Sequence, residues 1–208
     1  MNTSTNLPLA LFSALRGRLF TRVIDDYSRN EPVQLRGWTL LALSLYLSTQ
    51  IRKYQDFRIG VALPPGIAGI LGNLAVLFAG KVPVNLNLTV SRDSMVASLK
   101  EAEIKVILSA GKVRAKFPDF PWTDDFIDLG TSIQSEKSRK VALLFIAIQL
   151  VFLPLKISKR FGLNQIAKNR KEAVFLFTSG ISSRRKVVVL SAQNILSKCC
   201  QMNSLGLF

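Results

Sequence analysis

The sequence predicts an α/β protein with a parallel or mixed sheet and helices on both faces of that sheet. Three observations support this fold class: short β-branched segments alternate with helical segments, the chain has 208 residues, and 49% of these residues are hydrophobic. A chain of this length and composition can bury a sizeable core. Strands that alternate with helices at this spacing form βαβ units, whose strands run parallel.

The first quarter of the chain reads as helix, strand and helix. Apolar residues recur at helical spacing over 8–20, which predicts an N-terminal amphipathic helix. A β-branched pair followed by Asp, Ser and Asn over 22–32 predicts a short strand and a turn. Residues 39–54 predict a second helix, with Arg52 and Lys53 in its last turn, where cations complement the helix dipole.

The central region carries the alternation most clearly. The segments predict, in order, a strand at 58–63, a helix at 66–79, a strand at 82–86, a helix at 91–102 and a strand at 105–109. The helix at 66–79 is apolar on most faces, so we expect it to be buried against the sheet. Ser91 is a suitable N-cap for the next helix. Residues 111–135 look irregular, apart from a short strand at 126–129.

The segment at 137–160 is an apolar run with basic flanks. Residues 141–155 carry no charge, and Lys or Arg residues lie on both sides of them. A membrane-spanning helix needs about 20 apolar residues, so spanning is not the interpretation we favour. A buried core helix and an interfacial helix lying on anionic lipid both remain open.

Charge and the rare residues limit the classes of function. Residues 131–208 contain 13 Lys and Arg against 2 Asp and Glu, so the net charge of +15 is concentrated there and indicates an anionic partner. Histidine is absent, which excludes Ser-His-Asp and Cys-His catalysis and His-ligated metals. Cys199 and Cys200 are adjacent and have no other cysteine to pair with, which favours a reduced, cytoplasmic setting. We predict no secretory signal.

Several polar and charged residues could bind a ligand or act in catalysis, but their surroundings do not favour such a role. Asn85 and Asn87 follow a predicted strand, where a ligand could approach, but asparagine at a strand end is usually a turn former. The carboxylate pairs Asp25–Asp26 and Asp124–Asp125 are neighbours in predicted loops or turns, and we interpret them as solvated. No recognition motif and no interleaved aromatic residues accompany the basic clusters, so we do not expect nucleic-acid binding.

The most informative stretch is 173–195, AVFLFTSGISSRRKVVVLSAQNI. It predicts an apolar strand, a loop of small hydroxyl and basic residues, a second strand and the start of a helix. Such a loop can bring backbone N–H groups and positive charge to a phosphate. Its lysine does not have the spacing of the P-loop pattern GxxxxGK[ST]. From composition alone, a solvated basic turn is favoured over a phosphate loop.

Two stretches together carry a family resemblance. Residues 60–111, which contain LPPGIAGILGNLAVLFAGKVPVNLN, and the later FTSGISSRRKVVVLSAQNI resemble the N-terminal half of the AMP-forming adenylate synthetases. The first stretch is most similar to the branch that activates fatty acids for acyl carrier protein, often joined to a lysophospholipid acyltransferase. The resemblance implies that residues 21–208 are a partial N-terminal AMP-binding domain, preceded by the amphipathic helix at 1–20.

The family pattern [ST]SG[ST]TGxPKG identifies a candidate ATP-phosphate set in this chain. Thr178, Ser179, Gly180, Ser182 and Lys186 match it, with hydroxyls and backbone N–H groups as donors and the lysine as the charge. The chain departs from this pattern at four positions: Ile181 replaces a hydroxyl residue, Ser183 a glycine, Arg185 the proline and Val187 the last glycine. A β-branched Val at a position that needs glycine is strained.

The resemblance implies a function and its partners. It implies an AMP-dependent fatty acyl ligase that uses ATP with Mg²⁺, a fatty acid, and acyl carrier protein or CoA as the acceptor thiol. The later family motifs have no counterpart in these residues, so we assign no catalytic residue and no protein metal ligand and expect the chain to be inactive alone. The alternative is a non-catalytic protein that binds an anionic membrane surface. The expected location is the cytoplasm, and both hypotheses are compatible with peripheral attachment to the inner face of the membrane.

Overall fold

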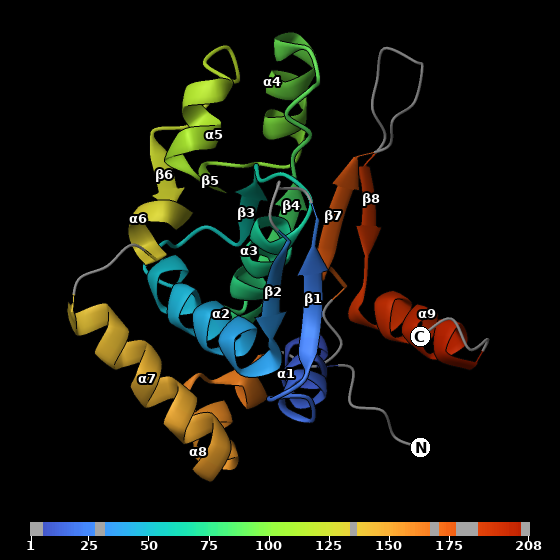
Figure 1. Ribbon diagram of the computed structural model, residues 1–208. Coiled ribbons are helices and arrows are strands. Elements are labelled where there is room, and N and C mark those ends of the chain that lie inside the picture. Colours follow the sequence, from blue (N-terminus) through green and yellow to red (C-terminus); the bar gives the residue numbers. More distant parts are fainter. Residues whose placement is uncertain (1–5, 28–31, 134–136, 167–170, 178–186, 205–208) are drawn as a thin grey trace.

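The computed structural model describes residues 6–27, 32–133, 137–166, 171–177 and 187–204 (Figure 1). The helices are α1 Leu7–Arg16, α2 Gly37–Ile51, α3 Ile67–Phe78, α4 Arg92–Glu101, α5 Gly111–Lys116, α6 Leu129–Ile133, α7 Lys137–Phe152, α8 Pro154–Arg160, the short 3₁₀ helix η1 Leu163–Gln165, and α9 Ala192–Ser204. The strands are β1 Arg22–Asp26, β2 Val33–Arg36, β3 Arg58–Val61, β4 Val82–Asn85, β5 Val106–Ser109, β6 Asp125–Asp128, β7 Val174–Phe177 and β8 Val187–Leu190.

A six-stranded sheet forms the centre of the structure, in the order β6-β5-β3-β4-β7-β8. The first five of these strands run parallel, and β8 runs antiparallel to β7. Strands β1 and β2 form a separate antiparallel pair, of which the sequence predicted only the first strand. The predicted fold class, a mixed sheet with helices on both faces, is confirmed.

The alternation of side chains along the strands divides the core in two. Ile59 and Val61 of β3 belong to a large core that also contains buried residues of α2, α3 and α7. Ala62, which follows β3, and Ile107 of β5 belong to a second core with Met95 of α4. Successive side chains of a strand point to opposite faces, so the two cores lie on opposite faces of the sheet. Helices therefore cover both faces.

The large core is built in layers away from the sheet. Helix α3 lies next to the sheet, α2 packs along α3, and α7 packs on α2 (Figure 1). Ala75, Val76 and Phe78 of α3 are completely buried. The nearly all-apolar helix predicted at 66–79 is therefore a core helix.

Arg52 does not lie in the last turn of α2, as the sequence predicted, because that helix ends at Ile51. Its guanidinium instead donates hydrogen bonds to the carbonyl oxygens of Phe78, 2.6 Å away, and of Phe161. These carbonyls belong to the C-terminal ends of α3 and α8, where cations are favourable. Burial lowers the pKa of Arg52. One arginine thus joins the ends of two other helices.

A second cation, which is partly buried, lies at the amino end of β4. The Nζ of Lys81 donates to the carbonyl oxygens of Tyr54 and Asp56, each at 2.6 Å. Burial lowers the pKa of Lys81, and the negative charge of Asp56 opposes that shift. The lysine ties the segment before β3 to the start of β4.

The prediction that 111–135 is largely irregular is wrong in two places, since α5 and α6 form there around the correctly predicted strand β6. Asp128, the last residue of β6, explains both helices. Its Oδ1 accepts hydrogen bonds from the backbone N–H groups of Gly111, at 3.1 Å, and Gly130, at 2.7 Å. For α5 this cap comes from 17 residues away and leaves no local sequence signal, whereas for α6 Asp128 is the residue directly before the helix.

The basic-flanked apolar segment forms two helices, α7 and α8, which meet at Leu153 and Pro154. Within the described parts of the chain, no helix is long and apolar enough to cross a membrane. The division of the chain at residue 20 stays a prediction.

The hairpin β1–β2 contacts the sheet layer through the start of α3. Asp26 Oδ2 of β1 accepts a hydrogen bond of 2.9 Å from the backbone N–H of Ile67, the first residue of α3. Gly66, at the N-cap, has a φ of +104°, and a Cβ on it would lie 2.4 Å from Asp26 Oδ2. Position 66 therefore requires glycine for two reasons: its positive φ, and the lack of space for a Cβ beside Asp26.

We predict that Gly66→Ala destabilises the protein by about 1–3 kcal/mol, because it adds backbone strain and displaces the Asp26 cap. Urea denaturation measures the difference. Gly17→Ala is the matched control, since Gly17 has helical φ and ψ and its nearest potential Cβ neighbour is 3.5 Å away. Equal effects of the two substitutions would contradict this account.

Candidate functional site

The carboxyl ends of the parallel strands meet at one edge of the sheet. From β3 the chain enters α3, which packs in the large core, and from β4 it enters α4, which packs in the second core on the opposite face. Adjacent strands whose connections leave to opposite faces create a crevice at their carboxyl ends, where ligands of open α/β sheets bind. The border between β3 and β4 is such a switch point.

The hairpin β7–β8 frames the predicted phosphate loop next to this crevice. Its last pair is Phe177 with Val187, so residues 178–186 connect the two strands at the carboxyl end of β7. Strand β7 runs parallel to β4, with Val84 opposite Phe175. The predicted contacts Thr178, Ser179, Gly180, Ser182 and Lys186 lie outside the described residues. Their role stays a prediction, and only the two strand ends that carry them are placed.

Val187 is not strained, contrary to the sequence expectation. It is the first residue of β8 and is paired with Phe177. Among the described residues other than glycine, only Glu103 has a positive φ. A β-branched residue suits an extended strand, so its presence where the family pattern has glycine has no backbone cost here.

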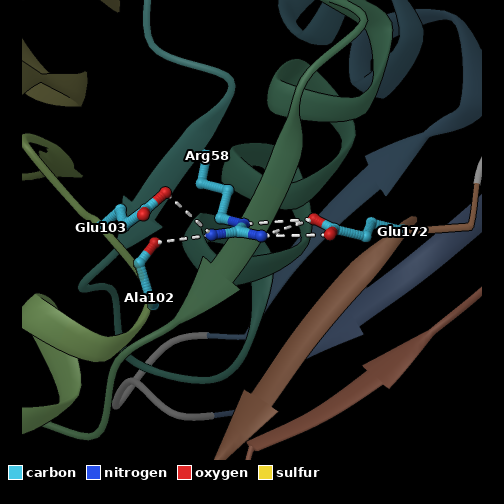
Figure 2. A network of polar contacts seen from close by, with 4 residues as sticks. All are labelled: Arg58, Ala102, Glu103 and Glu172. Carbon is cyan, nitrogen blue, oxygen red and sulfur yellow. Dashed lines mark hydrogen bonds and ion pairs between the residues drawn. The ribbon is translucent and has the colours of Figure 1, made fainter.

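Arg58, at the start of β3, holds β7 in place across β4 (Figure 2). Its Nε and Nη2 donate to the carboxylate of Glu172, two residues before β7, at 3.0–3.1 Å. Its guanidinium also lies 4.6 Å from the centre of the Phe175 ring. Arginine binds a carboxylate in this two-pronged way with fixed geometry. This pair could not be predicted from the sequence, because no local pattern joins residues 114 positions apart.

A pair of amide side chains lies at the switch point. Asn73 of α3 and Asn85 at the end of β4 exchange two hydrogen bonds, of 2.9 and 3.0 Å. Asn73 was also missed, although it is the one strongly polar residue in the apolar sequence of α3. Asn87 Oδ1 accepts from the N–H and hydroxyl of Thr89, which confirms its interpretation as a turn former.

Two carboxylates near this edge serve the fold. Asp128 caps α5 and α6, and Asp26 caps α3, so Asp26 is not the solvated residue that the sequence suggested. Asp25 is exposed, and Asp124 and Asp125 are exposed at the amino end of β6, on the opposite edge of the sheet. No group of three His, Cys, Asp or Glu side chains that could hold a metal ion occurs within the described ranges.

The sequence that joins β7 to β8 has a composition suited to an anion. Residues 178–186 include small hydroxyl residues, Gly180 and three consecutive cations, 184–186. Backbone N–H groups, hydroxyls and a lysine together are the donors that proteins present to phosphate.

Comparison with known proteins identifies the family. Residues 40–207 match the AMP-binding enzyme family, and the chain belongs to it. Among curated proteins, a search finds no match.

Solved structures share the fold at low sequence identity. The peptide synthetase FmoA3 bound to AMPPNP has a TM-score of 0.69 and 13% identity, over 98% of this chain and 19% of its own. MatB from Rhodopseudomonas palustris has a TM-score of 0.64 and 16% identity, and the match covers 99% of this chain and 38% of MatB. A fatty acyl-adenylate ligase from L. pneumophila, in complex with acyl adenylate and pyrophosphate, has a TM-score of 0.62 and 15% identity. The match covers 97% of this chain and 32% of the ligase. The chain thus spans less than half of the length of these relatives.

We predict that Glu172→Ala destabilises the protein by about 1–2 kcal/mol, because it leaves the Arg58 guanidinium without its main partner; partial solvent screening keeps the effect small. Urea denaturation gives the change in the free energy of unfolding. Glu103→Ala is the control, since Glu103 contacts the same arginine at 3.4 Å but its side chain is 80% exposed. We expect the control to stay within about 0.5 kcal/mol of wild type. A Glu172→Ala protein as stable as the control would show that the pair does not hold β7.

Proposed function

We propose that this chain is part of an ATP-dependent, adenylate-forming acid–thiol ligase that acts on a fatty acid. In this reaction a carboxylate oxygen attacks the α-phosphorus of ATP, pyrophosphate leaves, and a thiol then attacks the acyl carbon and releases AMP. The observation that carries the proposal is the position of the TSG…K sequence. It connects β7 and β8 at the carboxyl edge of the sheet, within residues that match the AMP-binding family.

The proposed phosphate contacts are Thr178, Ser179, Gly180, Ser182 and Lys186. Hydroxyls and backbone N–H groups donate to phosphate oxygens, and Lys186 supplies a positive charge. Arg184 and Arg185 add to the local positive potential. ATP fits this donor set. Mg²⁺ would accompany the nucleotide phosphates, since the described residues contain no carboxylate cluster for it.

The acyl group and the acceptor are finer parts of the proposal. The similarity of residues 63–87 to the branch that serves acyl carrier protein supports a fatty acid and a carrier thiol, with CoA as the other acceptor. One structural relative is named a fatty acyl-adenylate ligase and another a fatty acyl CoA synthetase from Mycobacterium tuberculosis, which supports this substrate class. The two cysteines, exposed and unpaired, support a reducing compartment such as the cytoplasm.

We also propose that these 208 residues supply only part of an adenylation site. The support is the length of the relatives, of which the chain spans 19–38% for the three compared above. Phosphoryl chemistry depends on positioning and on charge stabilisation from several sides, so a partial site does not catalyse it.

We expect no ATP–pyrophosphate exchange above the blank when the purified 208-residue chain is incubated with ATP, Mg²⁺ and fatty acids of several lengths. Radiolabelled pyrophosphate measures the exchange, and circular dichroism confirms that the chain is folded. Exchange that requires both a fatty acid and the protein would overturn the proposal that the site is partial, and would support the ligase directly.

Lys186→Ala is expected to weaken nucleotide binding about tenfold or more, because it removes a charge-assisted hydrogen bond to phosphate. Titration with a fluorescent ATP analogue, competed with unlabelled ATP, measures the affinity. Lys198→Ala is the matched control, since Lys198 is an exposed lysine of α9. Failure of the wild-type chain to bind ATP, or equal affinities in the two variants, would refute the assignment of the loop.

A further inference from the structure

Helix α7 is apolar on two opposite sides, and only one of them is packed. Ile146 and Leu150 are buried in the large core, with exposed fractions of 5% and 0%. Six other apolar side chains in and just after α7 form what we call the α7 apolar face. They are Leu144, Phe145, Ile148, Val151, Phe152 and Leu153, each 42–75% exposed. Their spacing along the helix places Leu144, Phe145, Ile148, Val151 and Phe152 on one stripe.

The layered fold explains why this face is open. Helix α7 is the outer helix of its layer: it packs on α2, and α2 packs on α3 beside the sheet (Figure 1). It lies far from the hairpin β7–β8 in this view. A contiguous set of large exposed apolar side chains marks an interaction surface in a water-soluble fold.

Basic side chains border the face. Lys156, Lys159 and Arg160 of α8, which we call the basic rim, are exposed. Arg160 donates a hydrogen bond of 3.0 Å to Gln149 of α7, and its guanidinium lies 5.5 Å from the centre of the Phe145 ring. These contacts hold a cation beside the apolar face. Residues 137–171 contain nine Lys and Arg residues and no Asp or Glu.

We propose that the α7 apolar face docks on the surface of a membrane rich in anionic lipids, with α7 parallel to the membrane plane. The apolar side chains enter the boundary between headgroups and acyl chains, and the basic rim contacts lipid phosphates. The charge of the basic rim distinguishes a membrane surface from a second copy of the chain as the partner of this face. A symmetric second copy would bring two basic rims together, which is unfavourable, whereas an anionic surface complements them. The proposal does not depend on the ligase assignment.

Vesicle co-sedimentation tests the proposal. We expect the chain to bind phosphatidylcholine vesicles that contain roughly 30 mol% phosphatidylglycerol at least about tenfold more tightly than pure phosphatidylcholine vesicles, and added salt to weaken the binding. Ile148→Glu is expected to abolish binding to both, and the double variant Lys156→Gln, Lys159→Gln to lower the affinity for anionic vesicles about tenfold or more. Thermal unfolding followed by circular dichroism confirms that each variant is folded.

Matched controls come from the opposite face of the sheet. Val96→Glu changes an apolar side chain of α4 that is 46% exposed, comparable to Ile148 at 48%. The double variant Lys100→Gln, Lys112→Gln removes two exposed lysines from α4 and α5. Both controls are expected to bind vesicles as wild type does. Equal loss in controls and test variants would mean that only net charge or general hydrophobicity matters, and would overturn the assignment to α7.

Depth measurement separates insertion from simple adsorption. Phe152→Trp is expected to be quenched by brominated lipid more strongly than Val96→Trp, since both variants retain the same two native tryptophans. Equal quenching would overturn docking through α7. A second outcome would also overturn it. If wild type fails to bind vesicles and light scattering detects a dimer that Ile148→Glu dissociates, the α7 apolar face is an interface between copies of the chain.

Discussion

The attachment of β7 to the parallel sheet is the contact on which the proposed site depends. Strands β3, β4 and β5 follow one another through compact βα units, whereas β7 arrives after the long excursion through α5 to α8. Its direct ladder with β4 contains a single residue pair, Val84 with Phe175. The Arg58 guanidinium adds a two-pronged contact to Glu172 and a ring contact to Phe175, which fix β7 at its amino end. The loop at the other end of β7 therefore begins from a defined position.

Long-range polar contacts also define the ends of the helices. Asp26 of β1 caps α3, Asp128 of β6 caps α5, and Arg52 binds the final carbonyls of α3 and α8. Each contact satisfies backbone groups that a helix end leaves without an internal partner. Because these side chains come from distant elements, helix formation and tertiary assembly are coupled in this fold.

The sequence predicts the elements whose information is local. The β-branched strand β5 and the apolar helix α3 were recognisable from their composition, and so was the strand–loop–strand order around 178–186. Helix α6 was missed although Asp128 directly precedes it, because the helix has only five residues. Helix α5 was not recognisable, because its cap, the same Asp128, lies 17 residues further along the chain. The same reason applies to the site: the Ser, Gly and Lys pattern is local, whereas the Arg58–Glu172 pair and the Asn73–Asn85 pair exist only after the sheet forms. The exposed side of α7 could not be distinguished from its buried side, because both are apolar.

Strand β8, which follows the proposed phosphate loop, has an unusual composition. Three consecutive valines, 187–189, present the same side chain to either face of the sheet. A shift of one residue along β7 would ordinarily exchange the inward and outward side chains of a strand, at a high cost in free energy. Here such a shift exchanges one valine for another, and the opposing constraint is the hydrogen bond of 2.8 Å from Ala173 N–H to the Leu190 carbonyl. The register of β8 therefore rests on backbone hydrogen bonds and on its pairing with β7, and not on the pattern of its side chains.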